Sequence, residues 1–472
     1  MSNPSLEAQG LAAKESVPPA AVRGAGFALA VLFSMNLLNY VDRYVFSSLG
    51  KRIEAGLDIN HAGFGVLAGA FMAVYTIVSP GIGLLGDRYS RRKLLAFGVG
   101  LWSLATVGTA FAQNFWQMFF WRALLGVGEA SYGIVAPTLL ADLFSPKQRG
   151  RVFGIFYLAL PLGGAVGFGI GGYFGAHGHW THAFWVVGIP GLLAAALALV
   201  INDPGRGASD GAAAGIKARP ALADYLTLFR TRSYLYNIAG MAAVTFATGA
   251  YASFTAIFYE EVRHMRSDLA SYWIGGLTAT AGLVGIVLGI GAADTLQKFT
   301  RRAYLLWACF ATTIATPFVL FGLLDPEVKS SLALVFVGMV LMASVLGPCN
   351  TVVANVVPAT RRAAGFAVNI FLIHALGDII SPFLIGHLSV WLGEPAVRAS
   401  PLGLLLSRLG AVPVASQDGQ FQTNLTAGML VVVPMLALGA LFFLIGSRHL
   451  PGDQERARRL GGGEGGRGIV PH

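Results

Sequence analysis

The stretch GLLGDRYSRRK (83–93) carries one acidic and four basic residues and lies between two apolar runs, 62–86 and 93–112. Charges at this density are costly in hydrocarbon, so they mark a short loop at a membrane surface. Each flanking run approaches or exceeds the roughly 20 residues that an α-helix needs to cross a bilayer. The segment therefore predicts two transmembrane helices joined by a charged turn.

The composition of the whole chain agrees with this interpretation. Of 472 residues, 55% are hydrophobic and 12% are charged, and the mean hydropathy is +0.64. Soluble globular proteins carry about 25% charged residues, so a soluble fold and a disordered body are both excluded. Cys309 and Cys349, the two cysteines, lie in apolar runs, which excludes a disulfide scaffold.

Apolar runs of spanning length recur along the chain and predict an all-α membrane protein with twelve transmembrane helices. These runs lie near 25–50, 62–86, 93–112, 115–143, 152–175, 183–201, 233–261, 269–293, 303–324, 332–357, 363–392 and 424–446.

The distribution of basic residues predicts the orientation. If the N-terminus is cytoplasmic, the segments on that side hold 24 Lys and Arg residues and the opposite side holds 7. The positive-inside rule then places both termini in the cytoplasm. The net charge of +10 follows this topology and does not indicate a nucleic-acid partner.

A polar segment at mid-chain (202–232) divides the chain into two halves of six helices. PTLLADLFSPKQRGR (137–151) is echoed about half a chain later by NTVVANVVPATRRAA (350–364). Two related, pseudo-symmetric halves are typical of transporters that bind substrate between them near the midplane. We expect an N-terminal tail (1–24), a first half (25–201), a linker (202–232), a second half (233–446), which includes a long outer loop (393–423), and a C-terminal tail (447–472).

The first predicted helix contains NLLNYVDRY (36–44). Asn36, Asn39 and Arg43 fall on one helical face, which should line a polar space. Asp42 and Arg43 point about 100° apart, so they are poorly placed to pair with each other. Ionisable residues in a span indicate function by default; the alternative is a structural ion pair.

The fourth predicted helix contains WRALLGVGEASY (121–132), with Arg122 and Glu129 seven residues apart on one face. Arg43 and Arg122 should share a depth about 10 Å from the outer surface, with Glu129 deeper. We expect Arg43, Arg122, Asn39 and Glu129 to bind an anion; the alternative is an Arg122–Glu129 brace. Glu129 is the first candidate for proton coupling, and Asp42, nearer the outer face and better hydrated, is the second.

The segment IHALGDIISPFLIG (373–386) places His374 and Asp378 four residues apart, as a proton relay or a structural hydrogen bond. Gly167, Gly169 and Gly172 match a dinucleotide-binding pattern, but inside an apolar helix with no preceding strand. With no phosphate-binding loop and no metal-ligand spacing, we expect no cofactor, no metal and no enzyme activity.

Residues 83–93 resemble the loop G-x-x-x-D-R-x-G-R-R-K of the major facilitator superfamily, with Ser90 in place of the second glycine. In that family the loop latches the cytoplasmic side, so the resemblance implies gating roles for Asp87, Arg88 and Arg91. The alternative is ordinary positive-inside charge.

A closer resemblance, to the Spinster branch of that superfamily, covers most of the chain and is carried by NLLNYVDRY, GVGEASY, APTLLADLFSPKQRGR, FYLALPLGG and IHALGDIISP. It implies transport of sphingosine-1-phosphate or a lysophospholipid, in some members coupled to protons. Asp42, Arg43, Arg122 and Glu129 would then line the central cavity. The 26 Arg against 7 Lys suggest a bacterial protein. We expect it to lie in the plasma membrane, the inner membrane of a bacterium, as a monomer.

Phe254, Phe258 and Tyr259 could contact an acyl tail, or could simply pack. Arg43 and Arg122 are also compatible with two other functions. One is a proton-coupled transporter of a small organic anion or sugar acid, and the other is a membrane sensor built on a transporter fold.

Overall fold

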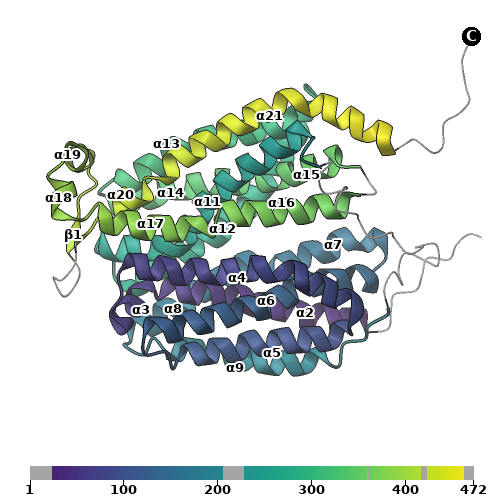
Figure 1. The fold of residues 1–472 in the computed structure, drawn as a ribbon, viewed down its shortest axis with the longest axis horizontal. Helices are drawn as coiled ribbons and strands as arrows, with labels where there is room; N and C mark the ends of the chain where they lie inside the picture. Colours follow the sequence, from purple (N-terminus) through teal and green to yellow (C-terminus); the bar gives the residue numbers. More distant parts are fainter. Residues whose placement is uncertain (1–23, 206–227, 359–360, 416–421, 462–472) are drawn as a thin grey trace, which may run out of the picture.

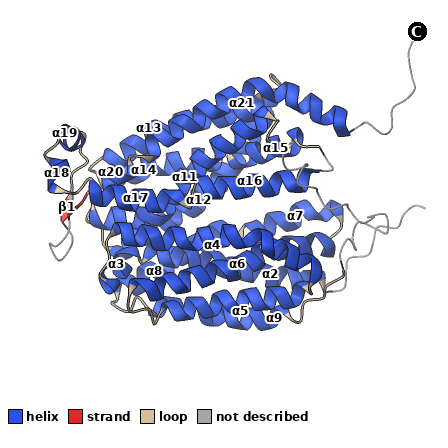
Figure 2. Cartoon of the chain, viewed as in Figure 1, coloured by secondary structure: helices blue, strands red, loops and turns tan. Residues whose placement is uncertain are grey.

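The computed structural model describes residues 24–205, 228–358, 361–415 and 422–461 (Figure 1). Nearly all of them are helical (Figure 2), as expected in lipid, where a helix satisfies its backbone N–H and C=O groups internally. The strands found in these ranges are β1 (Val414–Ala415) and β2 (Gln422–Thr423), an antiparallel pair in the long loop.

The helices of the first half follow the expected runs closely. They are α2 (Ala25–Ser48), α3 (Gly50–Leu57), α4 (His61–Arg88), α5 (Arg91–Thr109), α6 (Phe115–Leu143), α7 (Pro146–Tyr157), α8 (Ala159–Ala176) and α9 (His182–Ala198).

The second half repeats this layout and adds two short helices in the long loop. Its helices are α11 (Arg232–Glu261), α12 (Ser267–Gln297), α13 (Ala303–Leu324), α14 (Val328–Ala343), α15 (Leu346–Val356), α16 (Arg362–Leu376), α17 (Ile380–Trp391), α18 (Pro395–Arg398), α19 (Pro401–Arg408), α20 (Leu425–Met429) and α21 (Val432–Gly461).

The prediction of an all-α membrane protein is confirmed. Within the described ranges, ten segments are long and apolar enough to span a membrane. The third and sixth expected spans correspond to α5, which begins with three basic residues, and α9, an apolar helix of 17 residues. With these two, the helix order matches the twelve expected runs.

Four expected spans are each made of two helices in sequence: α7–α8, α14–α15, α16–α17 and α20–α21. The break between α16 and α17 lies at Gly377–Ile379, directly before Pro382. Proline has no N–H for the helical bond to residue 378, which favours an interruption at this point.

The two halves pack against each other reciprocally. α4, the second span of the first half, packs on α17, in the fifth span of the second half. α8, in the fifth span of the first half, packs on α12, the second span of the second half. This exchange is what a two-fold relation between the halves requires (Figure 1).

Contact between the halves is closest at the end of the bundle that carries α3, α18 and α19, here named the α3 end. A Cβ atom on Gly65 would lie 2.2 Å from the Pro382 carbonyl oxygen, so the backbones of α4 and α17 nearly touch. Ser48 donates a hydrogen bond across the interface to Ser271 (2.8 Å). Arg52 also pairs with Glu260, and His61 contacts Glu261 and Thr423, across the interface at this end.

The opposite end, here named the α7 end, carries α7 and the C-terminal end of α21 (Figure 1). α21 continues to Gly461, beyond the expected boundary at residue 446. The Ser233 N–H and hydroxyl both donate to Asp453 (2.9 and 2.8 Å), which fixes this extension to α11. Most of the expected linker, most of the N-terminal tail and residues 462–472 lie outside the described residues.

The glycine contact yields a stability prediction. Gly65→Ala should destabilise the observed conformation by about 1–3 kcal/mol, because the new methyl group meets backbone that cannot move aside. Gly81→Ala in the same helix is the matched control, since nothing lies within 4 Å of its Cβ position. Thermal unfolding of the purified protein in detergent measures both. A midpoint for Gly65→Ala at or above that of Gly81→Ala would contradict the close packing.

Candidate functional site

A buried ion pair between α2 and α6 forms the centre of the candidate site. Arg43 Nη2 lies 2.6 Å from Glu129 Oε2, and Arg43 Nε donates to the same oxygen at 2.7 Å. Asn39, one turn earlier on α2, is buried beside this carboxylate. The Glu129 side chain is 0% exposed, whereas that of Arg43 is 23% exposed. Arg43 is therefore the member of the pair that a ligand can reach.

Arg122 lies next to this pair, behind aromatic rings. Its guanidinium carbon is 3.9 Å from the centre of the Phe46 ring, and its Nε donates to the Leu67 carbonyl at 3.4 Å. The ring of Phe71 is 4.9 Å from the guanidinium carbons of both Arg43 and Arg122. The structure thus brings the two arginines together, as predicted. The ion-pair partner of Glu129 is Arg43, so the Arg122–Glu129 brace is not observed.

Asp42 accepts a short hydrogen bond from the Thr106 hydroxyl on α5, while Arg43 pairs with Glu129. This agrees with the prediction that Asp42 and Arg43 are poorly placed to pair. The expectation that Asp42 is better hydrated than Glu129 is wrong, since each residue is 1% exposed. The packing of α5 against α2 covers the Asp42 carboxyl, and the depth of a residue along its own helix does not show such a neighbour.

The charges of the site cancel formally, with two arginines against two carboxylates. Tyr40 and Tyr75 add ring faces 5.4 Å from the Arg43 guanidinium carbon, a distance at which cations are attracted to aromatic rings. Without a ligand this cluster is neutral. An anion that binds Arg43 adds negative charge to the site. A proton taken up by one of the carboxylates would restore neutrality.

His374 and Asp378 form the expected pair at the break between α16 and α17. His374 Nδ1 lies 3.0 Å from both carboxylate oxygens, and the two side chains are partly exposed. A Cβ atom on Gly249 of α11 would lie 2.5 Å from the Asp378 side chain, so α11 approaches closely here. This geometry suits a relay and a structural hydrogen bond equally.

In the charged loop, Arg91 is buried and binds two carboxylates of its own half. It donates to Asp142 at the end of α6 (2.5 Å) and to Asp203 after α9. Arg91 thus ties three helices of the first half together. Arg88 is exposed, and the Asp87 side chain lies outside the described residues.

A second buried cluster was not foreseen from the sequence. His61 Nδ1 lies 2.7 Å from Glu54 on α3, and His61 Nε2 lies 3.4 Å from Glu261 on α11. Their ligand atoms fall within 4.8 Å of one another, and their types are those that bind divalent metals. Burial raises the pKa of the Glu54 carboxyl, and the charges of His61 and Lys51 oppose that rise. Glu54 and His61 share a seven-residue spacing, but no local pattern connects them to Glu261.

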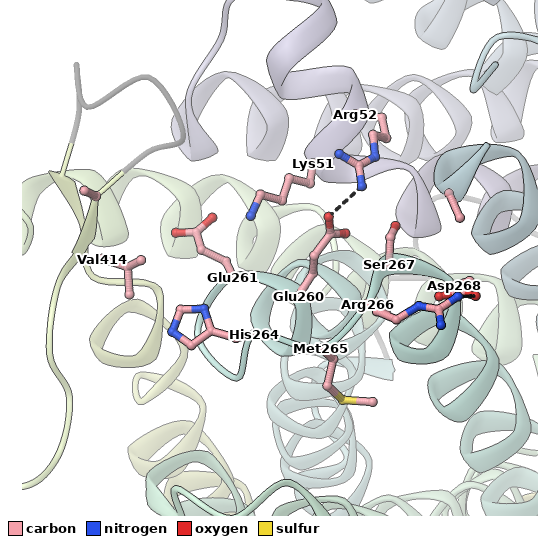
Figure 3. Close-up of a pocket in the computed structure, with 12 residues that line it drawn as sticks. Lys51, Arg52, Glu260, Glu261, His264, Met265, Arg266, Ser267, Asp268 and Val414 are labelled. Atoms are coloured by element: carbon pink, nitrogen blue, oxygen red, sulfur yellow. Dashed lines mark hydrogen bonds and ion pairs between the residues drawn. The ribbon is translucent and has the colours of Figure 1, made fainter. Parts of the chain in front are cut away.

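A pocket of about 590 Å³ opens beside this cluster at the α3 end (Figure 3). Its lining includes Lys51, Glu261 and His264, and Arg52 pairs there with Glu260 across the two halves (3.0 Å). This pocket is separate from the Arg43–Glu129 pair.

The aromatic residues of α11 have a structural role in this conformation. Phe254, Phe258 and Tyr259 are at most 1% exposed, and the Tyr259 hydroxyl bonds Ser331. Contact with an acyl tail is therefore not available to them here, and the packing alternative describes them.

The sequence and the fold both match known transporters. Residues 32–382 match the family model of the Major Facilitator Superfamily. Protein spinster from Drosophila melanogaster is 33% identical over 79% of this chain, which spans 65% of that protein's length. Sphingosine-1-phosphate transporter SPNS2 from Mus musculus is 30% identical over 91% of this chain and 78% of its own length.

A solved bacterial homologue of the human lysosomal transporter Spinster, in an inward-facing and unoccupied conformation, has the same fold. Its TM-score is 0.75 at 21% identity, over 92% of this chain and 98% of that one. The chain therefore belongs to the Spinster branch of the major facilitator superfamily, a family of membrane transporters and not of enzymes.

Proposed function

We propose that this protein moves a lysolipid, or a similar amphipathic anion such as sphingosine-1-phosphate, across the membrane by alternating access. The observation that carries the proposal is the partly exposed Arg43 held by the fully buried Glu129. A similar protein from mouse is named a sphingosine-1-phosphate transporter, which supports this substrate class.

The arginines provide the chemistry for an anionic head group. A guanidinium binds two phosphate oxygens at once, which a lysine cannot do. Electrostatic attraction is stronger in the low dielectric of the membrane interior than in water. Arg43 meets the head group first, and Arg122 becomes available only when Phe46 or Phe71 moves.

The Arg43–Glu129 pair also provides a mechanism for proton coupling. When a phosphate replaces Glu129 as the partner of Arg43, a buried carboxylate is left without its cation. A buried, unpaired charge is strongly unfavourable, so the carboxyl takes up a proton. Substrate and proton are then coupled through charge balance, with Asp42 as the second candidate.

The orientation completes the proposal. With both termini in the cytoplasm, the α3 end faces the outside of the plasma membrane, the inner membrane of a bacterium. The closed contacts at that end leave the site to be reached from the α7 end. Asp87, Arg88 and Arg91 would gate the α7 end, His374 and Asp378 would serve as a relay, and one chain would suffice for transport.

Uptake by proteoliposomes tests the function. Labelled sphingosine-1-phosphate, a lysophospholipid and small organic anions are offered with and without an imposed pH gradient. Lysolipid flux that rises with the gradient supports the proposal. Flux of small organic anions or sugar acids alone would favour a polar-anion transporter, and binding without flux of any compound would favour a sensor.

Arginine substitutions should separate a binding role from a structural one. Arg43→Ala should weaken binding of a phosphate-headed lipid about tenfold or more, because a charge-assisted contact is lost. Arg43→Lys should restore part of that loss, and Arg122→Ala should have a smaller effect on the first contact. Binding to purified protein in detergent measures all three. Unchanged binding in both alanine variants would make the arginines structural braces.

Glu129→Gln should separate binding from coupling. The amide mimics the permanently neutral carboxyl, so substrate should still bind and exchange while transport loses its response to a pH gradient. Counterflow and gradient-driven uptake in proteoliposomes measure the two properties. If the variant still concentrates substrate in a pH gradient, coupling lies elsewhere, and Asp42→Asn and Asp378→Asn become the variants to test.

Asp87→Asn should slow turnover more than it changes affinity measured from the outside, because it removes a charge from the proposed gate. Initial transport rates and equilibrium binding provide the comparison. An unaltered turnover would leave the loop as a topology signal alone.

A further inference from the structure

We propose that Glu54, His61 and Glu261 form a proton-binding latch in which a doubly protonated His61 holds the two halves together at the α3 end. The inference rests on the proposed transporter function for its role in alternating access. The latch itself is argued from geometry alone, and nothing in the Arg43–Glu129 site depends on it.

The His61 imidazole lies between carboxylates of opposite halves. Glu54 belongs to the first half and faces Nδ1 at 2.7 Å; Glu261 belongs to the second half and faces Nε2 at 3.4 Å. All three residues are buried. A single ring therefore makes one contact within its own half and one across the interface.

The hydrogen-bond partners of His61 indicate which of its ring nitrogens carry a hydrogen. An ionised carboxylate only accepts hydrogen bonds, so each ring nitrogen that faces one must carry a hydrogen. Thr423 cannot relieve this requirement, because its hydroxyl donates its one hydrogen to Glu261 Oε1 (3.0 Å) while it lies 3.4 Å from His61 Nε2. While both carboxyls are ionised, only the imidazolium satisfies both sides, because a neutral imidazole carries a hydrogen on one nitrogen alone. A neutral ring would turn a lone pair toward one of the carboxylates.

The local charge also favours a protonated ring. Glu54 and Glu261 carry two negative charges, and Lys51 on α3 adds one positive charge beside both of them. A protonated His61 brings the group to neutrality, whereas a neutral His61 leaves an uncompensated charge in a buried position, which is unfavourable.

The groups around the latch are few. α17 packs on the backbone of His61 and offers His387, whose ring faces Phe383 of its own helix. α11 contributes Glu260, which pairs with Arg52. The pocket that Lys51, Glu261 and His264 line (Figure 3) gives water a route to the edge of the cluster, so protons can exchange from the α3 end.

Loss of the His61 proton should therefore loosen the α3 end. Acid strong enough to protonate Glu54 and Glu261 should loosen it as well, because the carboxylates then lose their charge. In a transporter that opens to both sides, this contact must break in each cycle, which makes opening at the α3 end sensitive to protons independently of the substrate site.

Pulsed electron–electron spin resonance on the purified chain tests the latch without any transport assay. Spin labels at Ala55→Cys on α3 and Ala396→Cys on α18, both exposed and outside the cluster, report the distance between the halves, with Cys309 and Cys349 replaced by alanine. Raising the pH from about 7 to about 11 removes a proton that two carboxylates hold more tightly than free imidazole holds it, and should add a longer-distance population.

His61→Gln should raise the ratio of open to closed populations about tenfold or more at neutral pH and should abolish the shift between neutral and alkaline pH. Glu261→Gln, on the other half, should also favour the open population. His264→Gln is the matched control, since it removes a histidine from the same pocket but not from the cluster, and it should keep the wild-type response.

Three results would overturn the proposal: distances in the parent protein that do not change with pH, a response in His61→Gln equal to that of the parent, or a response lost in His264→Gln. Opening of the parent at neutral pH by a chelator, reversed by Zn²⁺, would identify a metal site in place of the proton latch. Failure of lysolipid flux with the pH response intact would reject the proposed substrate and leave the latch standing.

Discussion

Charge inside a membrane has to be balanced, and in this protein that constraint organises the first half. Arg43 would be prohibitively costly in hydrocarbon without Glu129, and Glu129 would be equally costly without Arg43. A buried ion pair is weak evidence for stability, because hydrophobic residues of similar volume often stabilise as much or more. The pair therefore fits the proposed function, in which an anionic ligand replaces Glu129 as the partner of Arg43. The rings of Phe71, Tyr40 and Tyr75 lie 4.9–5.4 Å from the Arg43 guanidinium carbon and add cation–π attraction to the pair.

A second constraint acts where the halves meet. Glycines at the α3 end let helix backbones approach so closely that even a methyl group would clash, and small residues of this kind are the usual means of packing helices in lipid. The polar contacts Ser48–Ser271, Arg52–Glu260 and His61–Glu261 join the halves at the same end. The close packing of the two halves therefore lies at the α3 end, and the charged Arg43–Glu129 site lies next to it, farther into the bundle.

Much of the fold and part of the site could be predicted from the sequence. Hydropathy located the spans, because each must be apolar over a fixed length. Helical spacing predicted that Asn39 and Arg43 share one face of their helix and that Arg122 and Glu129 share one face of theirs; the packing of α2 and α6 brings the two faces together. The sequence could not show that Thr106 covers Asp42, that Glu261 meets His61, or that Arg91 binds within its own half. Those contacts join residues from 51 to 200 positions apart, and side-chain spacing along one helix carries no information about a neighbouring one.

The position of Phe71 should couple the energetic effects of Arg43 and Arg122. Its ring stands 4.9 Å from each guanidinium carbon, so neither arginine can change its position without altering the surroundings of the other. Contacts that share a partner are thermodynamically non-additive. The free-energy effects of replacing Arg43 and Arg122 together should then differ from the sum of the separate effects, and removal of the shared ring should bring the two closer to independence. Under the proposed binding role, the two positive charges would act through this ring as one unit.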